Sequence, residues 1–104
     1  MKKVFISIPM NNRPITLIVA EMDNIRRQSS AALSEPIEML DSIVKEEYDS
    51  PLMYISKSIE TLSEADCAYF ADGWENARGC RIEHECCKDY GIEILNDKVE
   101  INSI

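Results

Sequence analysis

The chain has 104 residues, 45% of them hydrophobic, and a formal net charge of -8 at pH 7. This length predicts a single domain, residues 1–104, with a small core. The acidic balance argues against binding to a nucleic-acid polymer or an anionic membrane through bulk charge, although one site could still hold a small anion. No apolar run approaches the ~20 residues that span a bilayer, and no signal-peptide pattern opens the chain. We therefore expect a cytoplasmic protein whose four cysteines are reduced thiols.

In the first half of the chain, apolar runs alternate with helical periodicity. Residues 4–8 are an apolar, β-branched run that predicts a central parallel strand. Residues 15–33 have the periodicity of a helix, and Asn12 or Thr16 could cap its start. Residues 37–40 are apolar enough to predict a short second strand.

The second half continues the alternation. Pro51 suits the first residue of a helix, whose apolar stripe recurs at spacings of three and four: Leu52, Ile55, Ile59 and Leu62. Residues 67–71 predict a third, buried strand, and after a long loop a helix runs to Gly91, a C-cap position. Residues 92–95 predict a fourth strand, and residues 99–102 alternate like a short edge strand.

This order of elements predicts an α/β fold, a three-layer domain with a mostly parallel sheet of four or five strands. We expect a flavodoxin- or Rossmann-like strand order, 2-1-3-4(-5), in which the first and third strands adjoin at the topological switch point. Ligands of such folds bind outside the carboxyl ends of these strands, so residues 7–10 should lie beside residues 72–74. Glu83, early in the following helix, should point back at the same crevice.

Three segments also resemble a known family. They are residues 5–10 (Phe-Ile-Ser-Ile-Pro-Met), residues 63–66 (Ser-Glu-Ala-Asp) and residues 73–85 (Gly-Trp-Glu-Asn-Ala-Arg-Gly-Cys-Arg-Ile-Glu-His-Glu). Over nearly its whole length the chain resembles the DUF4406 family of small bacterial and phage proteins, which are similar to nucleoside 2-deoxyribosyltransferases. The resemblance implies chemistry at C1 of a sugar. A helix glutamate displaces the base and forms a covalent glycosyl-enzyme, which water or a second base then resolves.

The residue that matches this nucleophile is Glu83. The resemblance also implies that Asp72 accepts a hydrogen bond from a sugar hydroxyl and that Trp74 stacks on a base. Arg78 or Arg81 would pair with a phosphate if the ligand is a nucleotide. The other residues implied to bind substrate are Ser7, Pro9, Met10, Gly73 and Gly79. We expect no metal and no other cofactor, and the expected partners are a nucleoside or nucleotide and a second copy of the chain, because related transferases complete their sites from a neighbouring subunit.

The chain departs from deoxyribosyltransferases at three positions. Phe5 stands near the place of a Tyr that orients the nucleophile, Ile8 replaces a Gly and should narrow the crevice, and Ser58 falls near the place of a proton-donating Asp. These departures favour an alternative function on the same fold, a non-catalytic protein that binds a nucleotide or a nucleotide-derived signal. In a third reading, the acidic surface binds a protein partner.

Several of these residues also have purely structural interpretations. Glu83 could be a surface carboxylate stabilised by the helix dipole, and Trp74 could simply pack the loop onto the domain. The two arginines could pair with nearby glutamates, Glu75 and Glu85. Three residues share one helical face with a spacing at which zinc could be held, although buried thiols against the sheet are favoured: Cys80, His84 and Cys87.

Overall fold

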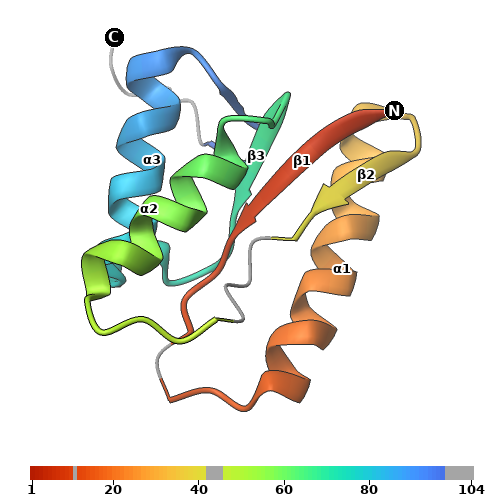
Figure 1. Cartoon of the computed structure of the whole chain (residues 1–104). Helices are drawn as coiled ribbons and strands as arrows, with labels where there is room; N and C mark the ends of the chain where they lie inside the picture. Colours follow the sequence, from red (N-terminus) through yellow and green to blue (C-terminus); the bar gives the residue numbers. More distant parts are fainter. Residues whose placement is uncertain (11, 42–45, 98–104) are drawn as a thin grey trace, which may run out of the picture.

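The computed structural model describes residues 1–10, 12–41 and 46–97 of the chain. Within these ranges strands and helices alternate along the chain (Figure 1). The elements are β1 (Lys2–Ser7), α1 (Ile15–Leu33), β2 (Ile37–Leu40), α2 (Pro51–Leu62), β3 (Cys67–Phe70), the 3-10 helix η1 (Trp74–Asn76), α3 (Arg78–Tyr90) and β4 (Glu93–Ile94). They confirm the predicted alternation, while the edge strand predicted over residues 99–102 lies outside the described residues.

The sheet has four described strands, all parallel, in the order β2-β1-β3-β4. This confirms the expected flavodoxin- or Rossmann-like order. β1 pairs with β3 from Val4↔Cys67 to Ser7↔Phe70, and the N–H of Ala71 extends the ladder to the carbonyl of Ser7 at 2.9 Å. The chain leaves β1 and β3 in opposite directions along the sheet, so the topological switch point lies where these two strands end.

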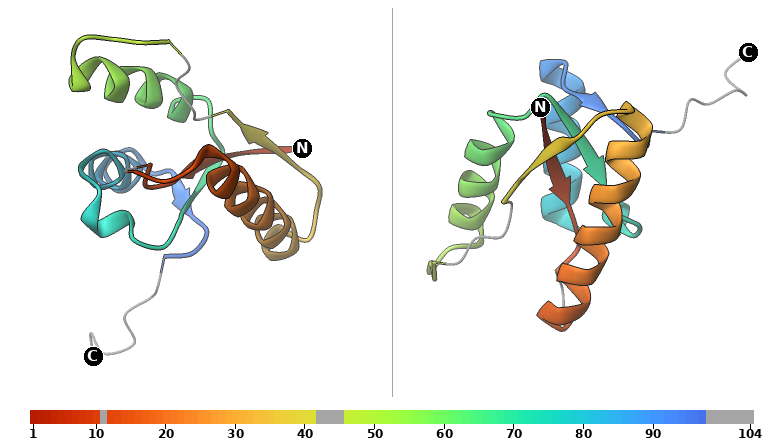
Figure 2. Two further views of the ribbon diagram at one scale, coloured as in Figure 1. Left: turned by 90° about the horizontal axis from the view of Figure 1, so that it is seen from below. Right: turned by 90° about the vertical axis from the view of Figure 1, so that its right-hand side faces the viewer.

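The helices form two layers around the sheet. α1 covers one face, and α2 and α3 cover the other (Figure 2). Side chains of β1 alternate between the two layers. On the α1 face the buried cluster comprises Val4, Ile6, Ile8, Ile18, Met22, Ile25, Cys67 and Ala71. On the other face it comprises Phe5, Leu62, Ala68, Phe70 and Cys87. Ser7, two residues after Phe5, therefore faces α2 and α3.

The start of α1 differs from the expectation. Its N-cap is Pro14, with φ at -59°, and no side chain caps the helix. The fixed φ of proline suits the entry to a helix, and the carbonyl of Pro14 accepts the N–H groups of Leu17 at 3.1 Å and Ile18 at 3.2 Å. The prediction that Asn12 or Thr16 caps this helix is wrong.

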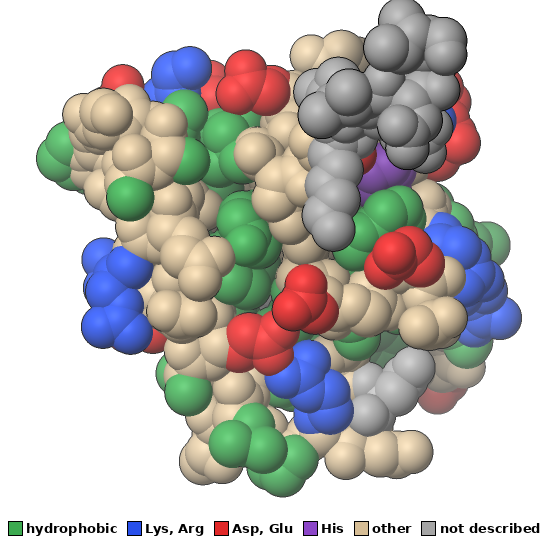
Figure 3. Space-filling view, turned by 180° about the vertical axis from the view of Figure 1, so that it is seen from behind, with side chains coloured by type: hydrophobic (Ala, Val, Ile, Leu, Met, Phe, Trp, Pro, Cys, Tyr) green, Lys and Arg blue, Asp and Glu red, His purple; other side chains and the backbone are tan. Residues whose placement is uncertain are grey.

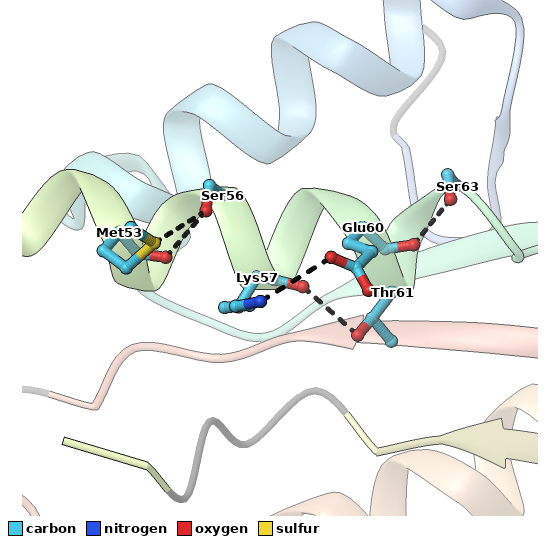
Figure 4. A network of polar contacts seen from close by, with 6 residues as sticks. All are labelled: Met53, Ser56, Lys57, Glu60, Thr61 and Ser63. Atoms are coloured by element: carbon cyan, nitrogen blue, oxygen red, sulfur yellow. Dashed lines mark hydrogen bonds and ion pairs between the residues drawn. The ribbon is translucent and has the colours of Figure 1, made fainter. Parts of the chain in front are cut away.

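α2 begins as predicted but is less buried than its stripe indicates. The hydroxyl of Ser50 accepts a hydrogen bond from the N–H of Leu52 at 3.2 Å, and Pro51 is the first helical residue. Leu62 is buried, whereas Leu52 is 72% exposed, so the predicted stripe is wrong at its first residue. Hydroxyls of α2 bond back to carbonyls of the same helix, Ser56 to Met53 at 3.0 Å among them (Figure 4).

The face of the molecule opposite to that in Figure 1 has mixed charge. From behind, acidic and basic side chains are interspersed with hydrophobic ones, so this face carries no continuous patch of one sign (Figure 3). No helix among the described residues is both long and apolar enough to cross a bilayer.

Candidate functional site

A cavity of about 790 Å³ lies at the carboxyl end of β1, between α2 and the start of α3. It is lined by residues 5–10 of β1 and its following loop, by Pro51, Tyr54, Ile55 and Ser58 of α2, and by residues 76–81 and 83 around the start of α3. Its size falls within the range of ~300–1,000 Å³ that is usual for small-molecule sites. The cavity is therefore at the edge of the sheet where α/β folds bind ligands.

Glu83 lines the cavity at the second turn of α3 and is only 6% exposed. The hydroxyl of Ser7 donates a hydrogen bond to its Oε1 at 2.6 Å. Ser7 itself is 2% exposed and ends β1. The interpretation of Glu83 as a surface carboxylate is therefore wrong, because this side chain is buried on the face of the sheet that α3 covers.

Burial changes the acidity of this carboxyl group. Loss of water raises the pKa of Glu83, and the hydroxyls of Ser7 and Ser58, which stabilise the charged form, oppose that rise. Burial also raises the pKa of the Cys80 thiol, while the hydroxyl of Ser7 lowers it and the nearby Glu83 raises it further. Ser7 thus lies between a carboxyl group and a thiol that both hold their protons to higher pH than exposed groups do. Perturbed acids of this kind are typical of functional sites.

Six of the nine residues predicted to form the site line this cavity: Ser7, Pro9, Met10, Arg78, Gly79 and Glu83. Ile8 also borders it, but its side chain packs in the cluster on the α1 face. Ile8 therefore narrows the cavity only at its border, which is less than the sequence led us to expect.

The other three predicted residues, Asp72, Gly73 and Trp74, are not among the described residues that line the cavity. Gly73 lies close to Pro9, since a Cβ on it would be 3.8 Å from the Cγ of that ring. Trp74 instead stacks on His84, with ring centroids 4.0 Å apart and planes 7° apart. One face of its ring is already covered by His84, which favours the structural interpretation of Trp74 over base stacking.

The family model described as a domain of unknown function, DUF4406, matches residues 4–96. The chain belongs to the DUF4406 family. No curated protein and no solved structure matches it. The matched residues include the described strands except the first two residues of β1, the three α-helices and every described residue that lines the cavity, so the cavity lies within the matched region.

The wall that α2 contributes to the DUF4406 cavity was missed in the sequence, apart from Ser58. The ring of Tyr54 lines the cavity, and its hydroxyl accepts the N–H of Tyr48 at 3.0 Å. The two tyrosine rings meet edge to face with centroids 5.4 Å apart. The strand order could have indicated this wall, because it places α2 beside α3 on the same face of the sheet. The aromatic residues among the described ones that line the cavity are Phe5 and Tyr54, not Trp74.

Gly79 of the DUF4406 domain allows α2 and α3 to approach each other closely. A Cβ at this position would lie 2.8 Å from the Cδ1 of Ile55, which is too short for any real contact. The absence of a side chain at Gly79 therefore leaves room for Ile55, and both residues line the cavity. Gly79 thus affects the shape of the cavity indirectly, by allowing the side chain of Ile55 to lie close to α3.

The cysteines and histidine of α3 do not form a metal site. Among the described residues, no three side chains of His, Cys, Asp or Glu lie close enough together to hold a metal ion. Cys80 and Cys87 are buried, and burial raises the pKa of Cys87 to about 12, so this thiol stays protonated and packs as a small apolar group.

Proposed function

We propose that this DUF4406 domain cleaves the N-glycosidic bond of a nucleoside or nucleotide, with Glu83 as the nucleophile. The observation that supports this function best is the buried Glu83 carboxyl group, hydrogen-bonded to Ser7 at 2.6 Å inside a cavity at the switch point of the sheet. The bond to Oε1 orients the carboxylate, and Oε2 is then the atom that attacks C1. The resemblance of the sequence to nucleoside 2-deoxyribosyltransferases, in which a helix glutamate acts in this way, favours the same chemistry here.

The proposed reaction has two steps. Oε2 of Glu83 bonds to C1 of the sugar while the C1–N bond breaks, and the bond's electron pair leaves with the base, which takes a proton from water. Water or a second base then attacks C1, displaces Glu83 and gives hydrolysis or transfer. Enzymes that cleave O-glycosides use two carboxyl groups. Among the described residues that line this cavity Glu83 is the only carboxyl group, which favours the N-glycosides, because a heterocyclic nitrogen leaves more readily than an alkoxide.

Ser58 supports a second candidate, binding without turnover. It lines the cavity, and its hydroxyl lowers the pKa of the Glu83 carboxyl group. Ser58 falls near the place where deoxyribosyltransferases have a proton-donating Asp. A serine hydroxyl is no stronger an acid than water, so Ser58 does not replace the proton-donating Asp, and the base would have to leave as an anion, which slows cleavage. The same cavity would then hold a nucleotide or a nucleotide-derived signal unchanged.

Base release separates the two candidates. The purified protein is incubated with the four 2′-deoxynucleosides and their 5′-monophosphates, with and without a second free base, and the products are separated by chromatography. We expect release by the wild type and by Glu85→Gln, an exposed glutamate on the same helix, and none by Glu83→Gln. If no base is released while nucleotides raise the unfolding temperature of both wild type and Glu83→Gln, the protein binds nucleotides without cleaving them.

We also propose that the protein self-associates and acts in the cytoplasm. Large apolar side chains are exposed at the start of α1 (Ile15, Leu17 and Val19) and of α2 (Leu52 and Met53), and contact with another molecule would remove their apolar surface from water. All four cysteines are free thiols, as is usual in a reducing compartment. Sedimentation of the wild type and of Leu17→Glu tests the self-association, and a monomer in both would exclude it.

A further inference from the structure

We propose that Arg78 and Arg81 bind a phosphate at the cavity, so that the ligand is a nucleoside 5′-monophosphate and not the free nucleoside. The identity of the sugar and base rests on the proposed function. The binding of the phosphate does not, because it requires no reaction at Glu83.

The charges that line the cavity are unlike those of the chain as a whole. The chain has 19 acidic and 11 basic residues, yet the charged residues that line the cavity are Arg78, Arg81 and the buried Glu83. No other Asp or Glu of the described ranges lines it. An anion that enters this cavity therefore meets two guanidinium groups and no exposed carboxylate among the described residues that line it.

These two arginines also differ from the other three in the chain, which are all paired with carboxylates: Arg13 with Glu21, and Arg26 and Arg27 with Asp23. Nη1 of Arg81 donates to the backbone carbonyl of Glu75 at 2.9 Å, which orients the guanidinium without cancelling its charge. Arg78 makes no ion pair or side-chain hydrogen bond with any part of the chain that the structure describes. The expected pairing of these arginines with the carboxylates of Glu75 and Glu85 is absent from the described contacts. Both positive charges are thus available to a ligand.

The spacing along α3 suits a sugar phosphate. Arg78 is the first residue of α3 and Glu83 lies five residues later, which separates them by about 7.5 Å along the helix axis. A pentose with a phosphate on its 5-carbon spans a comparable length, so C1 can meet Glu83 while the phosphate lies beside Arg78. A guanidinium group presents parallel N–H donors that match phosphate oxygens better than a lysine does.

The inference is tested by titration calorimetry with 2′-deoxynucleosides, their 5′-monophosphates and inorganic phosphate, at two salt concentrations. Each arginine substitution, Arg78→Gln or Arg81→Gln, is measured in the wild-type protein and in Glu83→Gln, which prevents turnover. We expect the 5′-monophosphate to bind at least about tenfold more tightly than its nucleoside, equivalent to about 1.4 kcal/mol. Each arginine substitution and higher salt should reduce this preference. Arg26→Gln, which removes the same charge from α1, should leave it unchanged.

Equal binding of nucleoside and monophosphate, or a preference that survives in both arginine variants, overturns the inference. So does a preference for inorganic phosphate over the 5′-monophosphate, because the site would then hold the anion alone. The proposed function fails separately. Tight binding of the monophosphate without base release would exclude the enzymatic function and support the phosphate site. Base release from nucleosides and monophosphates that bind with equal affinities would support the enzymatic function and exclude the phosphate site.

Discussion

The hydroxyl of Ser7 and the carboxyl group of Glu83 are 76 residues apart in the chain and meet at 2.6 Å. Ser7 ends β1, and Glu83 lies on the helix that follows β3. The contact exists because β1 and β3 are neighbours in the sheet and α3 returns over the face to which Ser7 points. Both side chains are almost completely buried, so the bond is shielded from water and the charge on Glu83 is unfavourable there.

This burial predicts that Glu83 destabilises the protein at neutral pH. Because the pKa of Glu83 is raised in the folded state, the folded protein binds this proton more tightly than the unfolded chain does. Its stability therefore falls as pH rises from the ordinary carboxyl range, about pH 4, through the raised pKa, and then levels off. Glu83→Gln keeps an acceptor for Ser7 and should unfold with a free energy of order 1 kcal/mol higher at neutral pH.

Urea denaturation from pH 4 to pH 8 measures this difference. The gain in Glu83→Gln should shrink to nothing as the pH approaches 4, and Glu85→Gln, a change at an exposed site on the same helix, should show no such gain. A constant difference at all pH values would contradict the assignment of the effect to a buried charge.

The pH dependence of base release should identify the role of Glu83. A nucleophile must be ionised, so the rate should rise with pH through the raised pKa of Glu83. Ser7→Ala removes a hydroxyl that lowers this pKa, and the rising limb should move to higher pH. A rate that instead falls through the same range would make Glu83 a proton donor and exclude the covalent mechanism.

Two adjacent serines of α1 should respond in opposite ways to removal of the hydroxyl. Ser29 is fully buried, and its hydroxyl has no hydrogen-bond partner among the described residues. Ser29→Ala should therefore raise the unfolding free energy by about 1 kcal/mol. Ser30 donates to the carbonyl of Glu35 at 2.7 Å, and Ser30→Ala should lower it by about 0.5–1 kcal/mol. Thermal and urea unfolding of both variants check the signs, and a loss in Ser29→Ala would mean that its hydroxyl is paired in solution.

The contact between Gly79 and Ile55 predicts a coupled pair of substitutions. Gly79→Ala adds up to about 1 kcal/mol of helix propensity, but its Cβ must displace the Cδ1 of Ile55, which lies 2.8 Å away. Ile55→Val removes that carbon. The double variant should therefore be more stable than the two single effects predict, by about 0.5–1 kcal/mol in a double-mutant cycle. Strict additivity would show that α2 moves aside without cost.

The sequence predicted the fold well because the residues that end its helices and strands can be recognised locally. Prolines and glycines mark the ends of elements, and the bounds of α1 and β2 agree with those predicted. Glu83 was placed correctly because strand order alone brings α3 to the end of β1. The stacking of Trp74 on His84 could not be predicted, because it is a contact between side chains that no periodicity reveals. Tyr54 was missed for a related reason, since a helical stripe shows which residues are apolar but not what lies opposite them.

The stack of Trp74 on His84 also gives the protein a built-in optical probe. The chain has a single tryptophan, and the imidazole that covers its ring belongs to the residue directly after Glu83 on α3. Any displacement of α3 that separates the two rings changes the environment of the indole, and with it the intensity and wavelength of its emission. Fluorescence can therefore follow events at Glu83 in real time without a label, from a position outside the described lining of the cavity.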